Sequence, residues 1–96
     1  MKYSKALKLV RAARKITQKE LAQKSNLDQS YISLIEQDKR VPGIDILEKL
    51  TSALEVPLYL FFFLASEKQD LKNVPEEEAD RLSRNLLKLF VELPKK

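Results

Sequence analysis

Residues 17–36 read TQKELAQKSNLDQSYISLIE, and this stretch decides the fold because it predicts two short helices joined by a tight turn. Thr17 is a good N-cap residue and Glu20 stands three residues later, so the two side chains are expected to form a capping box that starts the first helix. Asn26 lies in the turn, and asparagine is the non-glycine residue that best tolerates the left-handed backbone of a helix end. Asp28 is expected to cap the second helix.

Ala22 is small enough to let these two helices cross closely. Their apolar seam is expected to consist of Leu21, Leu27, Ile32 and Ile35. Polar residues at the front of the second helix take no part in this seam, and they carry hydrogen-bonding groups that can read base edges in DNA. We therefore predict a helix-turn-helix unit whose recognition helix spans 28–37 and whose base contacts are Gln29, Ser30, Tyr31 and Ser33.

Two side chains of the predicted recognition helix have alternative roles. Ser33 is expected to face the groove, whereas Tyr31 reaches either the DNA backbone or a thymine methyl group. Leu34 either contacts a methyl group as well or covers the edge of the core.

A resemblance to a known family is carried by five short runs, which are TQ at 17–18, ELA at 20–22, DQSYIS at 28–33, IE at 35–36 and KRVP at 39–42. They resemble the DNA-binding domain of the phage-repressor and Cro superfamily, and the match covers about residues 5–63. The run KSNLDQSYISLIEQ is also similar to controller proteins of restriction-modification systems. The sequence departs from the family pattern at Lys15 and Asn26, where many members have glycine.

The resemblance implies an all-α fold, with a five-helix lambda-repressor-like DNA-binding domain in residues 1–66. Residues 67–96 are then expected to form a connector and an additional C-terminal amphipathic helix for packing or oligomerisation. The resemblance further implies a partly buried ion pair between Arg11 and Glu36, with a structural role.

Apolar spacing predicts the helices on either side of the motif. The first covers about residues 3–14, and the fourth ends before Pro57, because the residue before a proline avoids the helical conformation. A short fifth helix at 58–66 is apolar nearly all round. The buried stripe of the fourth helix is expected to be Ile44, Leu47, Leu50, Ala53 and Leu54.

Gln18 is expected at the N-terminus of the motif's first helix, where free backbone N–H groups and the helix dipole favour a phosphate. The resemblance adds that this glutamine contacts the sugar-phosphate backbone and braces the recognition glutamine. Nearby basic residues can neutralise phosphates, although each can equally be an ordinary solvated charge. The predicted phosphate contacts are Gln18, Lys39, Arg40, Lys19 and Arg14.

The composition excludes several classes of protein. The 96 residues include no cysteine, no histidine and one glycine, which excludes disulfides, thiolate metal sites, the usual general base and glycine-rich phosphate loops. We therefore expect no enzyme activity, no metal and no cofactor. The net charge is +4, and all of this excess lies before residue 67, since seven basic and seven acidic residues balance from there onward. A basic N-terminal part suits DNA, although a merely soluble basic surface would carry the same charge.

Two apolar features of the C-terminal half predict an interface. The run LYLFFFL at 58–64 is hard to bury completely in so small a domain. Pro75 and three glutamates start a further helix, in which apolar residues from Ala79 to Leu93 recur at heptad spacing. This helix either covers the aromatic run within one chain or joins a dimer. The predicted interface residues are Tyr59, Phe61, Phe62, Phe63, Leu82, Leu86 and Leu89.

These features predict a sequence-specific transcription regulator, either a repressor or an autoregulator, that binds a palindromic operator in double-stranded DNA as a homodimer. The alternative is a protein-interaction adaptor or antitoxin-like partner that uses the apolar C-terminal half. The longest apolar run, at 58–65, is too short to cross a bilayer, so we expect a cytoplasmic protein without a membrane partner. No small-molecule ligand is indicated.

Overall fold

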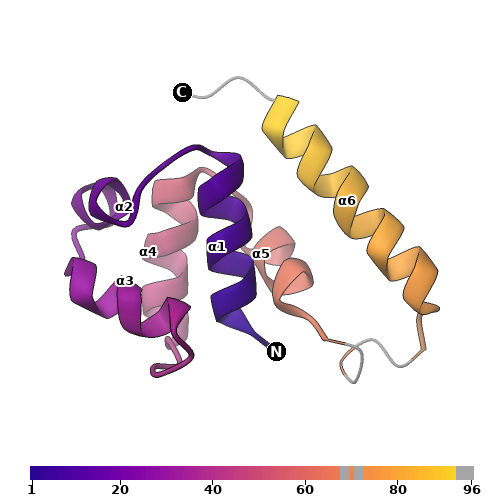
Figure 1. Ribbon diagram of the computed structural model, residues 1–96, viewed down its shortest axis with the longest axis horizontal. Coiled ribbons are helices and arrows are strands. Elements are labelled where there is room, and N and C mark those ends of the chain that lie inside the picture. Colours follow the sequence, from indigo (N-terminus) through magenta and orange to yellow (C-terminus); the bar gives the residue numbers. More distant parts are fainter. Residues whose placement is uncertain (68–69, 71–72, 93–96) are drawn as a thin grey trace.

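The computed structural model describes residues 1–67, 70 and 73–92, and within them the chain is helical with no strand. Figure 1 shows the first five helices packed into one body, with the sixth running along one side of it. This arrangement confirms the predicted all-α fold of five helices and an additional C-terminal helix. The helices are α1 (Tyr3–Ala13), α2 (Gln18–Ser25), α3 (Gln29–Glu36), α4 (Ile44–Leu54), α5 (Leu58–Ala65) and α6 (Glu76–Glu92).

The core is built around α1, which lies between α3 and α5 (Figure 1). Leu7 and Val10 of α1 are completely buried, as is Leu50 of α4. Removing one such side chain from water contributes about 1.5–3 kcal/mol. Helices of 8–11 residues are marginal when isolated, so α1 to α5 depend on this shared core.

The motif forms as its residues predict. The Glu20 backbone N–H donates to Thr17 Oγ1 at 3.0 Å and the Thr17 N–H donates to Glu20 Oε1 at 3.0 Å, which confirms the capping box. Asn26 ends α2 in the left-handed conformation, with φ of 58°. Asp28 occupies the N-cap position of α3, but its side chain makes no cap hydrogen bond, so that part of the prediction is wrong.

The aromatic run is divided between the core and the surface. Phe61 is completely buried, and its ring stacks on Tyr3 with a centroid distance of 6.4 Å. Its predicted place at a dimer interface is therefore wrong, because the side chain faces α1 of its own chain. Tyr59 remains 74 % exposed, and Phe62 and Phe63 are half-buried.

The buried stripe of α4 starts one turn later than predicted. Ile44 is 51 % exposed because it is the first residue of the helix and lies beyond the edge of the core. Ala53 is half-buried. The buried residues of α4 are Leu47, Leu50, Thr51 and Leu54.

α6 packs against its own chain, which is one of the two alternatives that the sequence left open. It lies beside α1 and α5, and Ala79 is buried (Figure 1). Leu82 stays substantially exposed. The side chains of Leu86 and Leu89 lie outside the described residues. None of the described helices is both long enough and apolar enough to cross a membrane.

We expect glycine at position 15 to stabilise the fold. Lys15 has φ of 56°, and a left-handed conformation costs an ordinary residue about 1–2 kcal/mol. Glycine also raises the entropy of the unfolded chain, so the expected net gain for Lys15→Gly is about 0.5–1 kcal/mol. The urea concentration at the midpoint of unfolding measures this gain in stability. The matched control is Lys24→Gly inside α2, which should lower the midpoint; an equal loss in both variants would contradict the argument.

Candidate nucleic-acid interface

The outer side of α3 carries polar side chains that the core does not use. Ile32, Ile35 and Glu36 point inward and are buried. The residues left on the accessible side are Gln29, Ser30, Leu34 and Gln37, which are exposed, and Ser33, which is half-buried. Three of the four predicted base-reading residues therefore share this surface. Leu34 is 38 % exposed, so its side chain is accessible on this surface.

Gln37 was not among the predicted base-reading residues. It directly follows α3 and its Nε2 donates to Ser33 Oγ at 2.7 Å. This hydrogen bond holds two polar side chains of the outer surface together. The signal in the sequence is the spacing, because residues four apart on a helix are neighbours.

Tyr31 has a different position from the other predicted readers. It is half-buried and packs against the core, and the guanidinium carbon of Arg40 lies 5.3 Å from the centre of its ring. A guanidinium over an aromatic face is attracted by the ring quadrupole. Tyr31 thus holds the exposed Arg40 beside the end of α3, and the sequence did not predict this contact.

The predicted ion pair ties α3 to α1. Arg11 Nε donates to Glu36 Oε2 at 2.8 Å and Nη2 donates to Oε1 at 3.0 Å, while Nη1 donates to the Ile16 carbonyl at 3.1 Å. Glu36 is only 5 % exposed, and its hydrogen bonds raise the pKa of the Arg11 guanidinium. We call Arg11, Glu36 and their hydrogen bonds the anchor.

Gln18 joins the anchor from the first position of α2. Its Nε2 donates to Glu36 Oε1 at 3.1 Å. The family resemblance implied that this glutamine braces the recognition glutamine at the start of α3, but its partner is Glu36 at the end of that helix. Lys19 and Lys39 are exposed, as a phosphate contact requires.

Arg14 is not a phosphate contact, and this prediction is wrong. The side chain is buried, and Nε donates to the Leu54 carbonyl at 2.9 Å while Nη2 donates to the Glu55 carbonyl at 2.7 Å. These carbonyls lie at the C-terminus of α4, where a cation opposes the negative end of the helix dipole. Burial lowers the pKa of the Arg14 guanidinium. Its role is to join α1 to α4.

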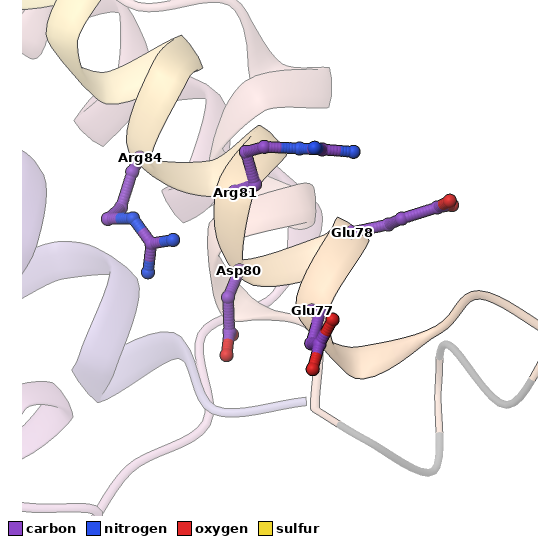
Figure 2. A pocket seen from close by; sticks show the side chains of 5 residues that line it. All are labelled: Glu77, Glu78, Asp80, Arg81 and Arg84. Carbon is purple, nitrogen blue, oxygen red and sulfur yellow. The ribbon is translucent and has the colours of Figure 1, made fainter.

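A second group of charged side chains lies on α6. Figure 2 shows Arg81 and Glu78 extending to one side of the helix, while Asp80 and Arg84 extend to the other. The pocket that they line with Glu77 holds three acids against two arginines. It lacks the positive excess that a phosphate-binding surface needs, so this group is not part of the candidate nucleic-acid interface on α2, α3 and the loop that follows.

We expect the two partners of the anchor to be strongly coupled in stability. Arg11→Met leaves the Glu36 carboxylate buried without its cation, and Glu36→Leu leaves the arginine without its acceptor, so each variant should lose about 3 kcal/mol or more. The double variant replaces the pair by apolar groups and should be more stable than either single variant. Urea unfolding of all four proteins measures this coupling, and additive losses would refute it.

Comparison with known proteins places the chain in a family. It matches the model of the helix-turn-helix family HTH_3 over residues 7–61, which is more than half of the chain. It is also 30 % identical over 95 residues to the immunity repressor protein of Bacillus phage phi105. That match covers 99 % of this chain and 64 % of the repressor, so the chain spans less than two thirds of this relative's length.

Similar structures have been solved. The crystal structure of the wild-type restriction-modification controller protein C.Esp1396I is 44 % identical with a TM-score of 0.61, and the match covers 64 % of this chain and 80 % of that one. A tyrosine-to-phenylalanine mutant of the same controller protein is 43 % identical with a TM-score of 0.61, over 64 % of this chain and 77 % of that one. The chain therefore belongs to the helix-turn-helix family HTH_3 and is of the phage-repressor type that its motif indicated.

Proposed function

We propose that this chain is a sequence-specific DNA-binding transcription regulator, and that it binds a palindromic operator as a homodimer through α3 and the residues at its ends. Residues 1–66 would form the DNA-binding part, and residues 67–96 would contribute packing or oligomerisation. The family is one of regulators rather than enzymes, and the proposal needs no cofactor. It would act in the cytoplasm, where its operator is accessible.

The observation that carries this proposal is the outer surface of α3. Gln29 and Ser30 are exposed, and no hydrogen bond of the fold depends on their side chains among the described residues. Glutamine can pair bidentately with adenine, and serine can donate to or accept from several bases. The anchor at the other end of α3 holds this surface in one orientation, which base reading requires.

Basic residues near α3 support the same proposal. Lys19, Lys39 and Arg40 are exposed near the two ends of the motif. Contacts from such residues to phosphates fix the position of a protein on the duplex, but they carry no sequence information. The proposed interface thus combines base-reading groups on α3 with cations at its margins.

A homodimer would present two copies of α3 to successive major grooves, about one helical turn of DNA apart. Tyr59 offers an exposed aromatic ring for the interface. Phe62 and Phe63 follow on the same helix and are half-buried. We propose that these three residues form one apolar patch, since a contiguous patch of this kind marks a protein contact. The phage relative is an immunity repressor, which favours repression as the outcome of binding.

A protein-interaction adaptor is the second candidate, and the exposed Tyr59 and Leu82 favour it. The same apolar surface would then hold a different protein, as an antitoxin holds its toxin. Selection of bound sites from random DNA separates the two candidates. A regulator should select a palindrome and bind it with a steep inverse dependence on salt, whereas indifference to DNA at low salt would support the adaptor.

We expect Gln29→Ala and Arg40→Ala to weaken DNA binding in different ways. Loss of a bidentate base contact should cost about 1–3 kcal/mol on the selected operator and relax the preference at one base position in each half-site. Loss of Arg40 should weaken operator and random DNA alike and reduce the salt dependence. Fluorescence anisotropy at several salt concentrations measures both. Equal losses of Gln29→Ala on operator and random DNA would remove Gln29 from the base-reading set.

We expect Tyr59→Ser to weaken the homodimer, because it removes an aromatic side chain that is mostly exposed in one chain. Sedimentation velocity over a range of protein concentrations should show dissociation to monomers at higher concentration than for the unchanged protein. Val41→Ser is the matched control, since Val41 is also exposed but lies in the loop after α3. A dimer that responds to neither substitution would place the interface elsewhere.

A further inference from the structure

The turn between α1 and α2 imposes a left-handed backbone on residue 15. The Lys15 N–H donates to the Ala12 carbonyl at 3.1 Å, and the Ile16 N–H donates to the Arg11 carbonyl at 3.1 Å. This is the hydrogen-bond pattern of a Schellman motif. Arg11 Nη1 also donates to the Ile16 carbonyl at 3.1 Å. The three hydrogen bonds hold residue 15 at φ of 56°, whatever its side chain.

Lysine is a poor residue for this backbone. In the left-handed region its Cβ lies too close to the following carbonyl oxygen, whereas glycine has no Cβ and avoids that clash. The Lys15 side chain is exposed, and it makes no hydrogen bond or ion pair within the described part of the chain. Lysine therefore strains this turn without a compensating side-chain contact inside the protein.

Three other non-glycine residues of the described chain are left-handed, and each has an explanation that Lys15 lacks. Asn26 and Asp38, with φ of 58° and 60°, are of the two residue types that tolerate this region best, because their short polar side chains can hydrogen-bond locally. Glu55, with φ of 58°, ends α4, and its carbonyl accepts from Arg14 Nη2 at 2.7 Å. Strained residues gather at functional sites, so the strain at Lys15 indicates a role in binding.

Lys15 lies at the margin of the candidate nucleic-acid interface. It stands two residues before Thr17, the N-cap of α2. The Ile16 carbonyl beside it accepts from the Arg11 side chain, which also binds the last residue of α3. The turn is thus fixed relative to both helices of the motif. A lysine at this turn presents a compact positive charge on a four-carbon stem, which suits a phosphate.

We propose that Lys15 is a DNA-backbone contact: its ammonium group donates to one phosphate in each half-site, and the strained backbone is tolerated because the cation is needed at this turn. This inference rests on the proposed function and extends its interface to the turn between α1 and α2. A phosphate contact carries no sequence information, so Lys15 contributes to affinity and not to the choice of bases.

Three substitutions at position 15 separate the charge from the strain. Lys15→Gln removes only the charge, Lys15→Gly removes both, and Lys15→Arg keeps both. Lys15→Gln and Lys15→Gly should each weaken binding to the selected operator about fivefold to tenfold at about 0.1 M salt, and lower the slope of log affinity against log salt by about 0.9, because one phosphate fewer is neutralised. Lys15→Arg should bind like the unchanged protein. Fluorescence anisotropy measures the affinity and the slope.

Urea unfolding of the same variants distinguishes binding from a structural role. Lys15→Gly should raise the midpoint of unfolding while it lowers the affinity for DNA, so the more stable protein should bind less tightly. A lysine that only opposes the negative end of the α1 dipole would leave the affinity unchanged. Unchanged affinity and unchanged salt slope in Lys15→Gln and Lys15→Gly would therefore overturn the inference.

Lys24→Gln is the matched control. Lys24 is also exposed, but it lies in the last turn of α2, at the opposite end of that helix from Lys15. Its substitution should leave the affinity and the salt slope nearly unchanged. Equal losses for Lys24→Gln and Lys15→Gln would show an effect of net charge alone and would overturn the inference.

The same measurements separate this inference from the proposed function. Failure of the unchanged protein to bind any DNA would overturn both. Specific binding of the unchanged protein, with no loss on Lys15→Gln, would overturn only the role of Lys15.

Discussion

The buried carboxylate of Glu36 is the constraint on which the arrangement of the first three helices depends. Glu36 is only 5 % exposed. Burying a charge to this extent costs free energy unless the charge is paired and hydrogen-bonded. Arg11 on α1 supplies two donors and Gln18 on α2 supplies a third. The last residue of α3 is therefore satisfied only when α1 and α2 both stand in their native places. This polar contact gives α3 an orientation that apolar packing alone, which is non-directional, specifies less sharply.

Under the proposed function, stability and recognition depend on different sides of α3. Ile32 and Ile35 contribute to the core, and Glu36 contributes to the anchor, so the inner side cannot change without loss of stability. Gln29 and Ser30 on the other side are exposed, and substitutions at such positions usually change stability little. If these residues read bases as proposed, a new preference for DNA sequence can arise on this scaffold without refolding it. Tyr31 lies between these sides, because its ring packs on the core while it also holds Arg40.

Interactions between residues close in the chain made much of this fold predictable from the sequence. Contacts between residues far apart in the chain explain most of the predictions that were wrong. The capping box of Thr17 and the left-handed Asn26 involve residues within one turn, so residue type and spacing were sufficient. Arg14 was misassigned because its acceptors are carbonyls forty residues away, and no pattern reveals them. Phe61 was misassigned for a different reason: a helix that is apolar on every side has no periodicity from which to choose the buried face.

The C-terminal half sets the limits on how a second copy could be added. α6 lies beside α1 and α5, so part of the surface that the apolar α5 would otherwise expose is already covered within the chain. Ala79 is buried, and its small side chain allows a close approach of helices. Tyr59 stays outside this contact, and most of its side chain is exposed to solvent. Burial of such an aromatic side chain would be strongly stabilising. A partner that covers Tyr59 would thus add to the packing of α6 rather than replace it, and the two halves of a palindrome could be read without unfolding the C-terminal helix.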